Sequence, residues 1–267
     1  MPTIDPSARI EPGAVIADDA TVGPFCVIGP HVKIGAGCRL VSHVNIAGDT
    51  TIGPRTTIAP FASLGTPPQS TAYRGEPTKL IIGADCDIRE GVTMNIGTAQ
   101  GHGETRVGDR CFLMANSHVG HDCIVGNNVT FANCATLGGH CVIGDWVFIG
   151  GLSAVHQFTH IGESVMVAGV TGVRADVIPF ALVIGAIGRL GGINVIGMRR
   201  RKFSRTALHA VRSAYMTLFD RNVGTLEQRI AAVEDRFGAT EPVDKILAFV
   251  REDRDRALCW PGDHHQD

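Results

Sequence analysis

A six-residue spacing of apolar residues constrains this sequence more than any other feature. Neither a helix, with a period of 3.6, nor a simple strand, with a period of 2, produces a period of six. The spacing is typical of a hexapeptide-repeat parallel β-helix, in which three hexads complete a coil of about eighteen residues. Residues eighteen apart then lie above one another, about 4.8 Å apart. The unbroken run comprises Val107, Leu113, Val119, Val125, Phe131, Leu137, Ile143, Ile149, Val155, Ile161, Val167 and Val173.

The same spacing begins at Ile4 and continues to Leu64. It lapses in residues 65–80, which contain Pro67 and Pro68, and again in the Gly-rich residues 97–106. Proline cannot donate to a β-ladder, so we expect loop excursions there. The repeat fades near Gly192, and we therefore predict a β-helix domain over residues 1–192.

Residues 193–267 have helical patterns and are predicted to form a small α-helical domain that covers the last coil. Ser204 is a helix cap, and Thr225 with Gln228 forms a capping box for a second helix. Pro242 indicates the start of a third helix. The apolar face of the first helix comprises Leu208, Val211, Tyr215, Leu218 and Phe219.

Composition narrows the classes of function. The net charge of −2 argues against nucleic-acid binding. The sequence has no signal-peptide pattern and no long apolar segment, so we expect a soluble cytoplasmic protein without stable membrane insertion.

Most cysteines fall at the small inward position of a hexad, which predicts core packing in a reducing compartment rather than a metal site or disulfides. These are Cys26, Cys38, Cys86, Cys111, Cys123 and Cys141.

Four histidines gather in one part of the repeat. His121, His140 and His156 fall within a residue of vertical alignment on three successive coils, and His118 shares the coil of His121. This column is where we look for chemistry. His31 and His43 lack such partners, and we interpret them as solvated corner residues.

The column indicates acyl transfer. His121 is the candidate general base, since neutral imidazole has a pKa of about 6.5. Asp122 follows it and is expected to orient its ring, while Gly139, one coil away, offers a bare N–H as an oxyanion donor. No Ser or Cys nucleophile lies in the column. The sequence therefore predicts direct attack by a substrate hydroxyl or amine on an activated acyl group.

Five motifs stand out along the chain: Arg74-Gly75-Glu76-Pro77-Thr78, His118-Val119-Gly120-His121-Asp122-Cys123, Leu137-Gly138-Gly139-His140, Ala154-Val155-His156-Gln157-Phe158 and Arg200-Arg201. Together they resemble the UDP-N-acetylglucosamine 3-O-acyltransferase family, which takes the first step of lipid A synthesis. The resemblance implies a left-handed β-helix, a homotrimer with active sites between subunits, a Gram-negative bacterial source and a (R)-3-hydroxyacyl-acyl carrier protein donor. It implies no cofactor, since the carrier brings its own 4′-phosphopantetheine, and no metal.

The resemblance also assigns site residues. His121 matches the catalytic base, Asp122 its partner and Gly139 the oxyanion donor. Gly169 matches a position that limits acyl-chain length, where glycine implies long acyl chains. The other implied substrate-binding residues are His118, His140, His156, Gln157, Tyr73, Arg74, Asn194, Arg200 and Arg201.

The sequence departs from the family pattern around the acceptor and the donor's exit path. Ser70 and Ala72 replace an acidic and a basic residue, and further changes are Asn95, Ile96, Ile187 and Ile196. These changes leave open the N-acylation of a 3-amino UDP-sugar. Two other classes compete with acyl transfer: a trimeric zinc enzyme of the carbonic anhydrase type, and a catalytically silent scaffold.

Overall fold

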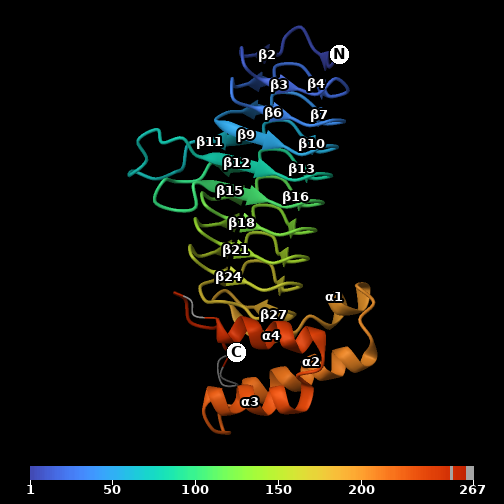
Figure 1. The fold of residues 1–267 in the computed structure, drawn as a ribbon, viewed down its shortest axis with the longest axis vertical. Helices are drawn as coiled ribbons and strands as arrows, with labels where there is room; N and C mark the ends of the chain where they lie inside the picture. Colours follow the sequence, from blue (N-terminus) through green and yellow to red (C-terminus); the bar gives the residue numbers. More distant parts are fainter. Residues whose placement is uncertain (253–254, 263–267) are drawn as a thin grey trace.

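The chain forms a long prism with helices at one end (Figure 1). The computed structural model describes residues 1–252 and 255–262. The prism is a left-handed parallel β-helix whose three faces are sheets, here called A, B and C in the order in which the chain visits them. In the part of the chain that is described, no helix is long and apolar enough to span a membrane.

Most strands are two residues long, because the chain turns a corner after each one. Sheet A contains β1 (Thr3–Ile4), β4 (Thr21–Val22), β7 (Arg39–Leu40), β10 (Thr57–Ile58), β13 (Asp87–Ile88), β16 (Phe112–Leu113), β19 (Thr130–Phe131), β22 (Phe148–Ile149), β25 (Met166–Val167), β27 (Ala181–Ile184) and β28 (Arg189–Ile193). Sheet B contains β2 (Arg9–Ile10), β5 (Val27–Ile28), β8 (Asn45–Ile46), β11 (Ser63–Thr66), β14 (Thr93–Asn95), β17 (His118–Val119), β20 (Thr136–Leu137), β23 (Ala154–Val155) and β26 (Gly172–Val173). Sheet C contains β3 (Val15–Ile16), β6 (Lys33–Ile34), β9 (Asp49–Ile52), β12 (Lys79–Ile82), β15 (Glu104–Val107), β18 (Ile124–Val125), β21 (Val142–Ile143) and β24 (His160–Ile161).

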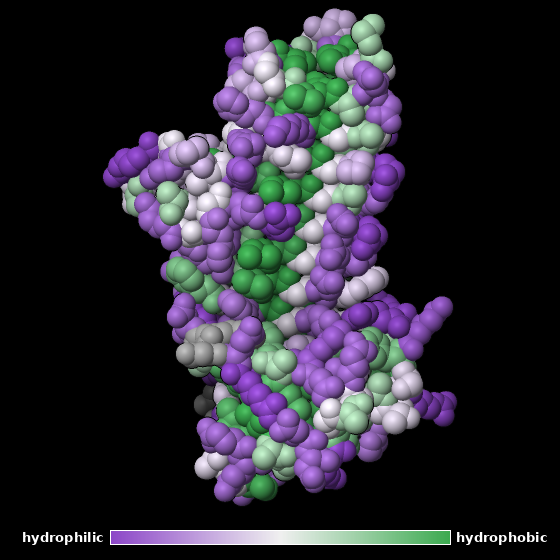
Figure 2. Space-filling model, viewed as in Figure 1, coloured by the Kyte–Doolittle hydropathy of each residue, from purple (hydrophilic) through white to green (hydrophobic). Residues whose placement is uncertain are grey.

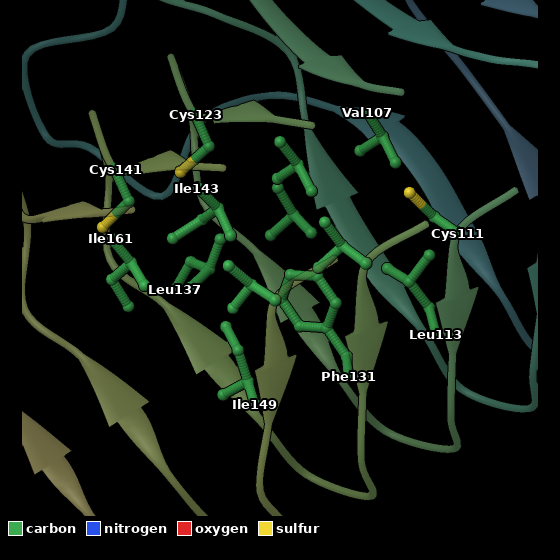
Figure 3. Packing of buried hydrophobic residues seen from close by; sticks show 14 of the residues in the cluster. Val107, Cys111, Leu113, Cys123, Phe131, Leu137, Cys141, Ile143, Ile149 and Ile161 are labelled. Carbon is green, nitrogen blue, oxygen red and sulfur yellow. The ribbon is translucent and has the colours of Figure 1, made fainter. Parts of the chain in front are cut away.

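The register confirms the eighteen-residue coil predicted from the spacing. Val119 pairs with Leu137, and Leu137 pairs with Val155, on successive strands of sheet B. The repeat residues fill the interior of the prism, and Phe131 is among the largest fully buried side chains (Figure 3). The cysteines are free thiols, and the six at the inward hexad position are all buried, as predicted. Of the other two, Cys259 is buried and Cys134 is partly exposed.

Both excursions leave the prism at the corner between sheets B and C, which we call the B/C corner. One runs from the end of β11 at Thr66 to the start of β12 at Lys79. The other runs from Asn95 at the end of β14 to Glu104 at the start of β15. Each excursion lengthens one coil. The register shifts at the end of the β11–β14 pair, between Leu64 and Thr66, but sheet C keeps its register, since Ile52, Ile82 and Val107 remain stacked.

Four helices cover the last coil: α1 (Val195–Arg200), α2 (Arg205–Leu218), α3 (Leu226–Phe237) and α4 (Glu241–Arg251). The predicted caps are present: Ser204 accepts from the Ala207 N–H, and Thr225 forms its capping box with Gln228. The short α1 and the antiparallel β27–β28 pair had no signal in the hexad pattern. After α4 the chain returns to the prism, where Leu258 bridges Asp176 and Pro261 bridges Leu190.

His31 and His43 are exposed corner residues, as expected, but the expectation that His43 lacks partners in a column is wrong. His43 does have partners in a column: its ring lies 5.0 Å from that of Phe25 and 5.1 Å from that of Phe61. These three residues occupy successive turns at the corner between sheets A and B, here the A/B corner. The eighteen-residue spacing that aligned the other histidines aligns these rings as well.

Candidate active site

His121 and Asp122 form the turn between β17 and β18, at the B/C corner. His121 Nδ1 lies 2.8 Å from Asp122 Oδ2. Asp122 adopts a left-handed backbone conformation (φ 58°) and is fully buried. Because an ionised carboxylate only accepts hydrogen bonds, Nδ1 carries the proton and Nε2 is left with a free lone pair. This is the state that a general base requires.

The Asp122 carboxylate remains ionised although it is buried. Burial alone would raise its pKa, but hydrogen bonds from Thr98 and His121 outweigh that effect, so the pKa of Asp122 lies below its usual value. The Thr98 hydroxyl lies 2.7 Å from Oδ2, and the His102 N–H donates to Oδ1 over 2.9 Å. A negative charge is therefore maintained directly beside His121.

Gly139 lies one coil below His121 and almost touches it. A Cβ at position 139 would lie 2.6 Å from Cε1 and 2.7 Å from Nε2 of His121. Only glycine fits here while the ring keeps its position. Among the residues described, the Gly139 N–H has no hydrogen-bond acceptor, so it is available to a ligand beside the imidazole. The candidate base and the candidate oxyanion donor thus lie side by side.

The third ring of the column is Phe158, not His156. Asp122, His140 and Phe158 occupy the same left-handed turn position on successive coils. His140 stacks on Phe158 with ring centroids 4.4 Å apart and packs edge-on against His121 at 4.9 Å. Burial lowers the pKa of His140, which keeps this ring neutral near pH 7.

His118 lies on β17, next to the turn that carries His121. Its Nδ1 is 2.8 Å from the hydroxyl of Thr93, its neighbour on β14. Burial lowers the pKa of His118, and the nearby His121 adds to that effect. The structure therefore places a neutral, hydrogen-bonding imidazole beside the candidate base.

The other predicted residues at this corner have different surroundings. His156 and Gln157 are exposed, and His156 Nδ1 lies 2.8 Å from a guanidinium nitrogen of Arg256. Tyr73 and Arg74 lie in the excursion between β11 and β12. The Arg74 guanidinium donates to backbone carbonyls of its own loop, so it is not directed at His121 in this chain.

Four predicted residues lie away from the B/C corner. Gly169 lies in an exposed turn at the A/B corner. The side chain of Asn194 caps α1 and donates to the Ser164 carbonyl. Arg200 is exposed at the end of α1. Arg201 is engaged within the chain: it contacts Glu163 and Ser164 and lies over the rings of Trp146 and Phe203.

His121, Asp122 and His140 also satisfy the spacing of a metal site, since their ligand atoms lie within 4.8 Å of one another. The hydrogen bonds of these residues argue against a metal site. Both Asp122 oxygens accept from backbone or side-chain donors, and His121 Nδ1 is protonated toward Oδ2. A divalent cation would have to displace these donors, so the set fits a base and its orienting carboxylate better than zinc ligands.

Sequence reasoning missed three residues here: Thr98, His102 and Phe158. Phe158 was within reach, because it follows His140 by one full coil. Thr98 and His102 belong to the excursion between β14 and β15, whose path over Asp122 has no periodic signal. Their contribution depends on backbone N–H groups, which a sequence pattern does not locate.

The fold and site together define a hexapeptide-repeat acyltransferase. A model described as bacterial transferase hexapeptide (six repeats) matches residues 13–48 and 104–139. A model described as UDP-N-acetylglucosamine O-acyltransferase, domain 2, matches residues 176–259. The chain is 57% identical over 259 residues to the acyl-[acyl-carrier-protein]–UDP-N-acetylglucosamine O-acyltransferase of Azorhizobium caulinodans, covering 97% of this chain and 95% of that protein. The chain belongs to the UDP-N-acetylglucosamine O-acyltransferase family.

Solved structures agree with this assignment. LpxA from Acinetobacter baumannii superposes with a TM-score of 0.91 at 37% identity, covering 96% of this chain and 99% of that one. The UDP-N-acetylglucosamine acyltransferase of Francisella novicida gives a TM-score of 0.93 at 30% identity, covering 98% and 95%. These identities are high enough for the likeness to extend beyond the fold.

Proposed function

We propose that this protein transfers an (R)-3-hydroxyacyl group from acyl carrier protein to the 3-hydroxyl of UDP-N-acetylglucosamine, the first step of lipid A synthesis. The observation that carries the proposal is the His121–Asp122 pair beside Gly139, whose backbone N–H has no acceptor among the described residues. The names of the relatives refer to O-acylation and so favour a hydroxyl acceptor over a 3-amino sugar.

In the proposed reaction, His121 Nε2 removes the proton of the sugar hydroxyl as its oxygen attacks the thioester carbon. The carbonyl oxygen becomes an oxyanion and accepts from the Gly139 N–H. As the intermediate collapses, the C–S bond breaks and the imidazolium returns its proton to the leaving thiolate. Asp122 stabilises the transient positive charge on His121. His121 carries the proton of the sugar hydroxyl to the leaving thiolate, so the reaction balances with the two substrates alone, and we propose no metal or cofactor.

We propose that the active form is a homotrimer. His121 lies at the B/C corner, whereas the predicted acyl-length residue Gly169 lies at the A/B corner, so a site that uses both needs a neighbouring subunit. The A/B corner carries exposed apolar side chains on several coils: Phe25, Phe61, Leu152 and Val170 are each more than half exposed. Hydrophobic surface also runs along the prism face seen in Figure 2. Burying such surface would stabilise association.

We further propose that the acyl carrier protein docks at the junction of α1 and α2. Arg199 and Arg205, together with Phe203 and Leu208, line a cavity of about 630 Å³ there. The helix ends expose several cationic side chains, which suit an acidic carrier. Arg201 is held by Glu163 and packs between aromatic rings, so we assign it to the junction rather than to the carrier surface.

The domain division and the compartment are part of the same proposal. Residues 1–192 would carry the catalytic corner, and residues 193–267 the carrier-docking helices. A cytoplasmic location is supported by the many buried free thiols and by the cytoplasmic source of acyl carrier protein. The bridges from Leu258 and Pro261 back to the prism make the two parts interdependent.

The test is a product analysis. Purified protein is incubated with one 3-hydroxyacyl-acyl carrier protein and a panel of UDP-sugars, and the products are identified by mass spectrometry. The proposal predicts an ester on UDP-N-acetylglucosamine that is cleaved by mild base. An amide on the 3-amino sugar as the main product would establish the alternative acceptor, and absence of acylation on all sugars would refute acyl transfer to a sugar nucleotide.

A further inference from the structure

The excursion between β14 and β15 folds over the carboxylate of Asp122. The Thr98 N–H lies 3.0 Å from each of the two carboxylate oxygens, and the Thr98 hydroxyl lies 2.7 Å from Oδ2. The His102 N–H adds a fourth contact, to Oδ1. With His121 on the remaining side, the carboxylate is surrounded by donors that come almost entirely from this one loop.

The loop is shaped for this contact. A Cβ at Gly101 would lie 2.4 Å from both Cγ and Oδ1 of Asp122. The backbone therefore passes so close to the carboxylate that only glycine fits at this position. The Gly101 N–H donates to Thr98 Oγ1 over 3.2 Å, and this directs the hydroxyl proton toward Asp122. Thr78 anchors the base of the loop by donating to the Gly97 carbonyl over 2.6 Å.

We propose that Thr98 is a positioning residue for the acyl transfer, acting through Asp122 to fix the ring orientation and the Nδ1–H tautomer of His121. The proposal deepens the function proposed above and rests on it. A buried carboxylate without donors would take up a proton or rotate toward other partners. His121 would then lose both its orientation and the negative charge that stabilises its imidazolium form during the reaction.

If Thr98 had a purely structural role, its replacement would lower stability without a specific loss of kcat. Three variants can distinguish this from a positioning role. Thr98→Val removes the hydroxyl while keeping the shape of the side chain, and Thr98→Ser restores a hydroxyl. Thr56→Val is the matched control. Thr56 is also fully buried, donates to the Gly83 carbonyl over 3.0 Å and accepts from the Cys86 N–H, but it lies on a coil distant from Asp122 in the chain.

Steady-state kinetics with both substrates, together with melting temperatures, decide between the two roles. We expect Thr98→Val to lower kcat about 10- to 100-fold, as loss of a hydrogen bond to a charged group does, with each KM within about twofold of the wild-type value. Thr98→Ser should recover kcat to within about threefold. Thr56→Val should lower the melting temperature but leave kcat unchanged. The proposal is overturned if Thr98→Val retains more than half of the wild-type kcat, or if Thr56→Val loses as much as Thr98→Val.

A second measurement does not depend on turnover. The ¹⁵N NMR signals of the His121 ring should report a single Nδ1–H tautomer in the wild-type protein and a tautomer mixture in Thr98→Val. Unchanged ring signals would overturn the positioning role. If the wild-type protein shows no acyl transfer at all, the proposed function fails while these signals still decide the role of Thr98. Should Thr98→Val not fold, Gly101→Ala displaces the same carboxylate and must show the same loss of kcat at unchanged KM.

Discussion

Oδ2 of Asp122 lies 2.8 Å from Nδ1 of His121, the residue that precedes it in the chain. Adjacent side chains normally diverge, but the left-handed backbone of Asp122 turns its carboxylate back toward the ring. The prism has such a left-handed residue at most of its corners. At the B/C corner of this coil, the turn carries the candidate base and its carboxylate partner instead of two solvated residues.

His121→Ala is expected to lower turnover by about 10²- to 10⁴-fold, because it removes the general base. The oligomeric state and melting temperature should remain close to the wild-type values, since His121 is partly exposed and lies outside the core. His31→Ala is the control: it removes an exposed histidine from the same corner, on an N-terminal coil. Turnover of His121→Ala within a factor of ten of the control would contradict the assignment.

Gly139→Ala is expected to lower kcat at least tenfold, because the new methyl group would overlap the His121 ring and push it from its place. A single-turnover assay measures the chemical step directly. Gly29→Ala is the matched control at the same corner. Its Cβ would lie 3.4 Å or more from its neighbours, an ordinary contact distance, so it should behave as the wild type. Equal activity of the two variants would show that the His121 position is not constrained by Gly139.

Stability should fall as the pH drops from about 7.5 to 5.5, in part because of His118. Burial holds the pKa of His118 below the value of 6.5 that it has when unfolded. As the pH falls through 6.5, the unfolded chain takes up protons before the folded protein does, and the folded state loses stability. His118→Gln removes this contribution, so the difference in free energy of unfolding between the two pH values should shrink. Denaturant titrations at both pH values measure it. An identical pH dependence in the variant would show that His118 does not titrate in this way.

Replacing Arg199 and Arg205 by glutamate is expected to raise KM for acyl carrier protein at least tenfold, with KM for the sugar nucleotide little changed. Both line the cavity at the α1–α2 junction. The salt dependence of kcat/KM for the carrier should also become flatter, because fewer attractive charges remain to be screened. Lys33→Glu with Arg39→Glu makes the same change in net charge on N-terminal coils and serves as the control. An unchanged salt response in the first variant would count against docking at this junction.

Gly169→Met is expected to shift donor preference from fourteen-carbon toward ten-carbon acyl chains. A Cβ at this position would meet only Gly151 backbone atoms, the nearest at 3.3 Å, so a longer side chain projects away from the prism. Each buried methylene contributes up to about 0.8 kcal/mol, so four can change selection by more than a hundredfold. Competition between the two donors on both proteins measures the product ratio. The same ratio in both would remove Gly169 from the acyl-binding path.

The regular part of the fold follows from the sequence, because the position of each residue in the hexad decides whether its side chain points inward. Val119, Leu137 and Val155 stack as their spacing predicts. The sequence predicts where the excursions lie but not their conformation. Prolines and glycines mark where the repeat is interrupted, whereas the path of a loop depends on contacts with residues far away in the chain. The β27–β28 pair and α1 were missed for the same reason, since neither continues the period of six.

In the candidate site, too, the residues on the regular coils could be predicted from the sequence, and those in the loop could not. Vertical alignment brought His121 and Gly139 together correctly, since they are eighteen residues apart. His156 was misplaced beside His140, because its strand-end position differs by two residues from that of Phe158, the true partner. Thr98 was recognised only as a loop residue. Its hydrogen bonds to a buried carboxylate arise from loop geometry, and no local sequence pattern encodes that geometry.

The return of the C-terminal segment to the prism has a consequence for biosynthesis. Leu258 and Pro261 complete bridges to Asp176 and Leu190, residues made much earlier during translation. The N-terminal coils can stack as they leave the ribosome, whereas the last coil cannot close until the segment that contains Leu258 and Pro261 has also been released. A ribosome that stalls late would therefore leave an open sheet edge, so premature termination should produce aggregates rather than a shortened, soluble enzyme.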